Sequence, residues 1–259
     1  MTHFRSLTLS VFASMALAGC SFMSGGGGTT DVYDALASGM SARSVGKVGN
    51  LVGAGPAEVS MTRSGSLIEV GVNGEVYELP GTSQTPFTNP QWVNRQEYID
   101  YRFAGGADSA SLIAGQYMAI AGVEDGVTGD IYLMHGGVET PTSGLPLLSA
   151  IYEGAWEVRH ADGDPTDSGV FAAAADFDAG SMNIDIQNSS GSTVGSGAGG
   201  ISGNAFATNF DVNISGSPSN NELAGKFYGP TGQEMAGVIE GEEVFGGNPT
   251  YGVLYGHQR

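Results

Sequence analysis

The chain has 259 residues, and its 43 glycines exclude a mainly helical protein, because glycine weakens a helix interior by about 1 kcal/mol relative to alanine. The formal net charge of −18 excludes nucleic acid as a partner, since phosphate binding needs a basic face, and it disfavours docking on anionic lipid. A single cysteine, Cys20, excludes a disulfide framework within the chain. The acidic balance suits an exposed, soluble protein, and it also leaves open the attraction of a cationic ligand.

The amino terminus has the pattern of a bacterial secretion signal. Arg5 precedes an apolar run over 7–18, which is shorter than the roughly 20 residues of a membrane-spanning helix. The run ends in Leu17-Ala18-Gly19-Cys20, which resembles the lipobox of bacterial lipoproteins. This resemblance implies a signal peptide over 1–19 and lipidation (palmitate) of Cys20. Because serine and not aspartate follows Cys20, it also implies anchoring to the cell outer membrane. An ordinary secretory signal with a chance cysteine is the alternative.

Residues 20–50 are predicted to form a lipid-anchored tether. Four consecutive glycines at 25–28 make its first part flexible. Val32 and Leu36 follow Asp31 at helical spacing, so one short helix over 31–40 is compatible with the pattern.

Residues 51–140 have strand patterns without helical periodicity. Asn73-Gly74 between the runs 67–72 and 75–79 predicts a β-hairpin, because both turn residues favour positive φ. We expect a proline-containing loop over 80–90 and further strands at 98–103, 114–123 and 130–134. The aromatic residues of this half are expected to form the core of a small sheet, with a binding face as the alternative. They are Trp92, Tyr98, Tyr101, Phe103, Tyr117 and Tyr132.

Residues 141–259 alternate between apolar and polar residues with period two, which predicts about eight antiparallel strands. In the first of them Tyr152 and Trp156 share an apolar face, while Glu153, Glu157 and Arg159 are expected on a wet face. Closure into a barrel would remove exposed edges, and the large apolar faces predict a filled lumen. A membrane-spanning barrel is the runner-up, disfavoured by the acidic residues on the polar faces. The other residues assigned to apolar faces are Gly154, Val158, Phe171, Ala173, Ala175, Phe177, Met182, Ile184, Ile186, Phe206, Thr208, Phe210, Val212, Ile214, Leu223, Gly225, Phe227, Met235, Gly237, Ile239, Tyr251, Val253 and Tyr255.

Three short sequences in this half resemble the barrel of transferrin-binding protein B and its relatives, which are surface lipoproteins of Gram-negative bacteria. They are Ala-x-Tyr-x-Gly-x-Trp at 150–156, Gly-Lys-Phe-Tyr-Gly-Pro at 225–230 and Gln-Glu-Met-Ala-Gly-Val at 233–238. The resemblance implies an all-β chain. A small handle-like β domain over 51–140 is followed by an eight-stranded antiparallel β-barrel over 141–259. Single-lobed relatives, which this chain resembles in size, are by implication receptors for haem, host proteins or complement regulators.

No catalytic or metal-binding motif stands out in the sequence. His135, His160 and His257 are isolated and are expected on the surface or in loops. The acidic segment 160–167 is expected to be a solvated hairpin turn rather than a calcium loop. We therefore expect a binding module and not an enzyme, with no cofactor and no metal.

The predicted function is that of a monomeric, surface-exposed lipoprotein of the outer membrane. It would capture an unknown protein or small-molecule ligand, with haem or an iron carrier as candidates, for an adjacent transporter. The alternative is a structural or immune-evasion lipoprotein of the envelope without a role in uptake.

Overall fold

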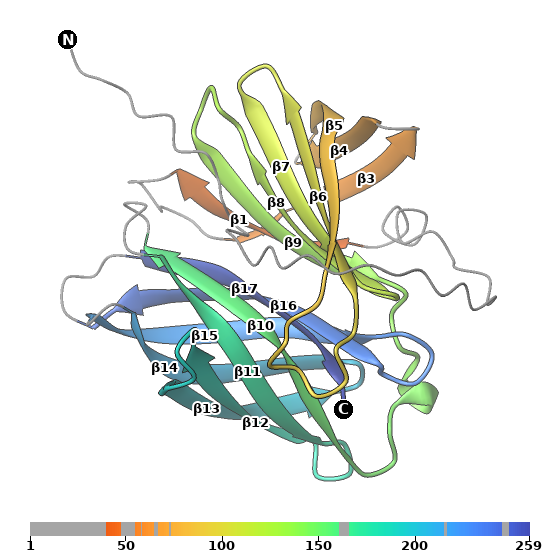
Figure 1. Ribbon diagram of the computed structural model, residues 1–259, viewed down its shortest axis with the longest axis vertical. Coiled ribbons are helices and arrows are strands. Elements are labelled where there is room, and N and C mark those ends of the chain that lie inside the picture. The colour runs from red at the N-terminus through yellow and green to blue at the C-terminus, as the bar shows by residue number, and fades with distance from the viewer. Residues whose placement is uncertain are drawn as a thin grey trace.

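The computed structural model describes residues 40–47, 55–57, 59–64, 67–72, 74–160, 166–214, 217–244 and 249–259. They form a curled nine-stranded sheet followed by a closed eight-stranded barrel, with the sheet resting against one side of the barrel (Figure 1). The signal peptide, Cys20 and nearly all of the short helix expected over 31–40 lie outside these ranges. Within them, no helix is long and apolar enough to cross a membrane.

The first sheet is antiparallel, in the order β2-β1-β9-β8-β7-β6-β5-β4-β3. Its two edge strands, β2 and β3, are separated by one residue in the sequence, so the sheet must curl until its edges approach each other (Figure 1). The strands are β1 (Met40–Lys47), β2 (Gly55–Ala57), β3 (Val59–Ser64), β4 (Leu67–Val72), β5 (Glu75–Phe87), β6 (Tyr98–Gly105), β7 (Asp108–Ala114), β8 (Met118–Glu124) and β9 (Asp130–Gly137).

The hairpin predicted at Asn73-Gly74 is confirmed. β4 pairs with the first half of β5, and Gly74 takes the positive φ of +89° that such a turn favours. The proline-containing loop expected over 80–90 is wrong for most of its length, because β5 continues to Phe87 and pairs with β6. Prolines are tolerated there because β4 pairs with β5 only as far as Pro80. Beyond Pro80, the only described strand beside β5 is β6, so this part of β5 resembles an edge strand.

Two further strands were not expected from the sequence in the form they take. The single strand predicted over 114–123 is in fact β8, and the glycine-rich turn expected before it contains β7. β1 pairs with β9 and lies inside the segment assigned to the tether. The domain boundaries themselves stay predictions.

The predicted eight-stranded antiparallel barrel is confirmed. Each strand pairs with the next, and β10 pairs with β17 from Tyr152↔Gln258 to His160↔Thr250, which closes the ring. A short 3-10 helix, η1 (Thr142–Gly144), lies in the connection between sheet and barrel. The strands are β10 (Ser149–His160), β11 (Thr166–Asp176), β12 (Ser181–Asn188), β13 (Thr193–Ser202), β14 (Ala205–Ile214), β15 (Ser217–Tyr228), β16 (Glu234–Glu243) and β17 (Pro249–Gln258).

Apolar side chains fill the barrel lumen. Aromatic residues of β10, β11, β14 and β15 meet there with Met182, Ile184 and Ile186 of β12. β13 makes room for them with glycine, since a Cβ on Gly197 would lie 2.5 Å from the Cβ of Phe210. The outer wall of the same strands is polar, as at the exposed Asp185. This is the reverse of the arrangement in a membrane-spanning barrel, whose apolar band faces outward.

The two domains share a core, and it contains three β17 residues that were expected in the barrel lumen. Tyr251, Val253 and Tyr255 do not face the lumen with Leu254 but face the first sheet. The aromatic residues of the first domain divide likewise: Tyr132 and Phe103 line the inside of the curled sheet, while others join the shared core. The buried members of the shared core are Trp92, Tyr98, Ile113, Met118, Ile120, Ile131, Leu133, Tyr228, Ala236, Val238, Tyr251, Val253 and Tyr255.

Candidate functional site

Glu234, at the start of β16, is a buried carboxylate that joins the barrel to the first domain. Its Oε1 accepts the backbone N–H of Gln116 at 2.9 Å, and its Oε2 accepts those of Tyr117 at 2.7 Å and Met118 at 2.9 Å. The side-chain amide of Gln96 donates to the same carboxylate. Burial raises the pKa of Glu234, and these hydrogen bonds act in the opposite direction. The carboxylate thus closes the turn between β7 and β8.

Glu153 on β10 makes a second connection of the same kind. Its Oε1 accepts the backbone N–H groups of Val93 at 2.5 Å and Asn94 at 3.0 Å, both in the loop between β5 and β6. Arg259 Nε lies 3.3 Å from Oε2, and His257 Nε2 lies 3.6 Å from Oε1. Burial lowers the pKa of His257, and the nearby Glu153 carboxylate partly offsets this. The end of the chain is therefore tied into the domain junction.

The face of β10 that was expected to be wet is instead buried under the first domain. Glu157 and Arg159 are paired, with Arg159 Nε 2.9 Å from Glu157 Oε1, and both are nearly inaccessible to solvent. Burial raises the pKa of Glu157 to about 7, although Arg159 and the Arg102 guanidinium of the first domain act to lower it. The prediction of a solvated face was wrong because it considered the barrel without the sheet that covers it.

The histidines also differ from the expectation of surface or loop positions. His135 on β9 is buried, and its Nδ1 lies 2.6 Å from the Tyr228 hydroxyl. Burial raises the pKa of Tyr228 well above its usual value, so this hydroxyl keeps its proton. His257 is also buried, at the junction described above. The side chain of His160 and residues 161–165 of the acidic turn lie outside the described residues, as does Cys20.

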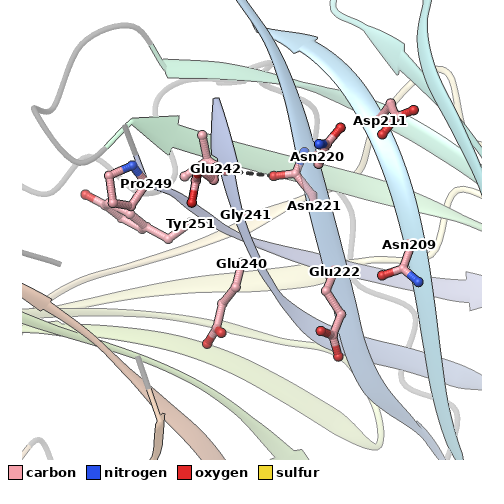
Figure 2. A pocket seen from close by; sticks show the side chains of 11 residues that line it. Asn209, Asp211, Asn220, Asn221, Glu222, Glu240, Gly241, Glu242, Pro249 and Tyr251 are labelled. Atoms are coloured by element: carbon pink, nitrogen blue, oxygen red, sulfur yellow. Dashed lines mark hydrogen bonds between the residues drawn. The ribbon is translucent and has the colours of Figure 1, made fainter. Parts of the chain in front are cut away.

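An acidic groove of ≈ 670 Å³ runs across the outer wall of the barrel over β14 to β17 (Figure 2). Among the described residues, no lysine or arginine lines it, and four carboxylates do, namely Asp211, Glu222, Glu240 and Glu242. Glu222 and Glu240 are direct cross-strand neighbours and extend in the same direction (Figure 2). This groove is the candidate binding site of the barrel.

Beneath the groove, on the lumen face of the sheet, hydrogen bonds link β15 to β17. Thr250 Oγ1 donates to Asn221 Oδ1 at 2.8 Å, and Asn221 Nδ2 donates to Ser219 Oγ at 2.9 Å. The groove was not predicted from the sequence, although alternation places Asn209, Asp211, Asn220 and Glu222 on outward positions. The signal would have been the strand register, which puts acidic residues of different strands side by side.

Residues 141–256 match the family described as the C-lobe and N-lobe beta barrels of Tf-binding protein B. The match covers the barrel and not the first sheet. The fold is also that of solved transferrin-binding protein B structures. The protein from Haemophilus parasuis Hp5 is 16% identical, with a TM-score of 0.59, and the match covers 85% of this chain and 45% of that one. The isotype 1 protein from serogroup B Neisseria meningitidis is 15% identical, with a TM-score of 0.58, over 85% of this chain and 43% of that one.

Because the matches cover 85% of this chain, the likeness to transferrin-binding protein B includes the first sheet as well as the barrel. At 15–16% identity the likeness concerns the fold alone. The chain spans less than half the length of these solved proteins. Among curated proteins, none matches the sequence.

Proposed function

We propose that the chain is a ligand-binding lipoprotein of the outer-membrane surface, anchored through Cys20, that captures a protein ligand in the acidic groove of its barrel. The likeness of both domains to transferrin-binding protein B supports a binding role. The lipobox-like end of the apolar run supports the anchor. The groove supports the choice of ligand, and it is the observation on which the proposal rests.

The charges of the groove favour a cationic ligand. Glu222 lies directly opposite Glu240 on the neighbouring strand. A lysine or arginine side chain of a bound protein would form charge-assisted hydrogen bonds with carboxylates of the groove such as Asp211, Glu222 and Glu242. Long-range attraction by a protein of net charge −18 would also speed the encounter.

Haem capture receives less support than protein capture. A flat apolar ligand needs an apolar slot, whereas the lumen is already filled with buried side chains. His135 and His257 are enclosed at the junction of the domains, so neither could reach haem iron without separating packed elements. Haem is therefore the second ligand offered in the binding test.

The test uses bacterial cells that display the full lipoprotein. Transferrin, the ligand named for the relatives, is the first protein to offer, with haem in parallel. We expect saturable transferrin binding that weakens with salt and falls about tenfold in the double variant Glu222→Gln/Glu240→Gln. Asp185→Asn, which removes an exposed charge from β12 outside the groove, is the control and should bind like the wild type.

Equal binding by all variants would reject the groove as the site. A haem signal without transferrin binding would favour the small-molecule alternative, and binding of neither would favour a structural or immune-evasion role. If the protein delivers its ligand to an adjacent transporter, deletion of its gene should slow bacterial growth when iron is scarce. Envelope sensitivity without a growth defect would instead contradict an uptake role.

A further inference from the structure

A second pocket lies at the junction of the two domains, away from the acidic groove. Its volume is ≈ 480 Å³, within the range of sites that bind small ligands. It is bounded by the loop before β6, the turn between β7 and β8, and the end of β17. The polar residues in its lining are Asn94, Gln96, Glu97, Gln116, His257 and Gln258.

The carboxamides of this pocket are oriented by contacts to the protein. Gln96 Nε2 donates to the buried Glu234 carboxylate, and Asn94 Nδ2 donates to the carbonyl of Gln258 at 3.1 Å. Reversing either amide would place two acceptor oxygens against each other, so both nitrogens are committed. Among the described residues no donor bonds the side-chain oxygens of Asn94 and Gln96, so both oxygens are available as acceptors.

The one charged carboxylate in the lining of the pocket is Glu97. Glu97 is exposed at its mouth and has no ion pair among the described residues. The Glu234 and Glu153 carboxylates lie behind its wall, bonded to Gln96 and Asn94 respectively. Two arginines lie nearby: Arg259, which follows β17, is held by Glu153 at 3.3 Å, and Arg95 is exposed in the loop before β6 but is not among the residues that line the pocket.

The junction pocket therefore offers an exposed carboxylate and oriented amide groups. We propose that it binds a cation that carries N–H donors, namely a guanidinium or a primary ammonium group. Such groups have several donors and no acceptor, and the planar guanidinium fork matches neighbouring carboxylate and amide oxygens. The proposal does not rest on the groove or on the nature of the protein ligand.

Titration of the purified full chain in detergent micelles with methylguanidinium tests the site. We expect saturable NMR shifts of the side-chain amides of Asn94 and Gln96 and of the backbone of Gly115. Tetramethylammonium, which has the same charge and no N–H, should bind at least tenfold more weakly. Glu97→Gln should weaken methylguanidinium binding about tenfold, because it removes the exposed partner of a charge-assisted hydrogen bond. Glu222→Gln makes the same change in the groove and should alter the affinity less than twofold.

Equal losses in Glu97→Gln and Glu222→Gln would overturn the proposal, because they would indicate general electrostatics rather than a site. Equal binding of methylguanidinium and tetramethylammonium would overturn it too, as would shifts caused by Ca²⁺ and not by methylguanidinium. A comparison of two ligands distinguishes a cation on a protein from a free small molecule. Tighter binding of the peptide Gly-Arg-Gly than of agmatine supports a protein side chain, and the opposite order supports a free small amine.

Discussion

Replacing Glu234 with alanine is expected to destabilise the protein by detaching the turn between β7 and β8. The variant leaves three backbone donors, those of Gln116, Tyr117 and Met118, without their carboxylate acceptor. Each orphaned donor costs about 1–3 kcal/mol where water cannot replace the acceptor. Gln116 is exposed, so its N–H can find water, whereas Met118 is fully buried.

The sum of these terms is partly offset by the removal of a charge from a buried position. Burial raises the pKa of Glu234, so the native structure bears a desolvation cost that alanine does not. We expect a net loss of about 3 kcal/mol in the free energy of unfolding, which lowers Tm by roughly 10 °C for a chain of this size. Glu234→Gln keeps one acceptor oxygen and should lose about half as much.

Urea unfolding measures the loss, and hydrogen exchange locates it. The amide of Met118 should lose its protection in Glu234→Ala, while amides of β12, far from the junction, keep theirs. Glu222→Ala, an exposed change on a neighbouring strand, serves as the control and should stay within about 0.5 kcal/mol of the wild type. A loss below about 1 kcal/mol in Glu234→Ala, with Met118 still protected, would refute the view that this carboxylate holds the turn.

Three further changes test other parts of the structure. In the wild type, the free energy of unfolding should fall by about 3 kcal/mol between roughly pH 5 and pH 8 as Glu157 ionises. Glu157→Gln should remove this fall, as measured by urea unfolding at each pH. The reason is that the folded-state pKa of about 7 exceeds the unfolded value, so this contribution is present at low pH and lost as pH rises; an unchanged slope would contradict it. Gly197→Ala should cost about 2 kcal/mol, because its Cβ would lie 2.5 Å from that of Phe210; a Tm equal to the wild type would show that β13 can shift. Tyr228→Phe should cost about 1–2 kcal/mol by leaving His135 Nδ1 without its hydroxyl; thermal unfolding measures it, and a neutral result would mean that another group satisfies the imidazole.

The parts of the fold that the sequence predicts are those where a strand has one apolar and one polar face. Met182, Ile184 and Ile186 alternate with outward polar residues, and all three lie in the lumen. The Asn73-Gly74 turn was predictable because local backbone preference determines it.

The errors arose where tertiary context overrides the local pattern. Prolines at 80 and 86 suggested a loop, but the second half of β5 borders a single described strand and accommodates them. Serines at 109 and 111 concealed β7, because small polar residues weaken the strand signal. The carboxylates of the domain junction could not be assigned partners, since their acceptor role depends on backbone N–H groups roughly 60 to 120 residues away along the chain.

β17 shows how the docking of the two domains is encoded. Its eight residues from Thr250 to His257 are all buried, with Leu254 in the lumen and Tyr251, Val253 and Tyr255 against the first sheet. β8 has six consecutive buried residues, and β16 packs against β8 and β9. Continuous burial is typical of strands covered on both faces, whereas a free antiparallel strand alternates, as β12 does. An unbroken apolar run in an otherwise alternating antiparallel chain therefore identifies the surface by which one domain rests on the other, and Glu153 and Glu234 border that surface.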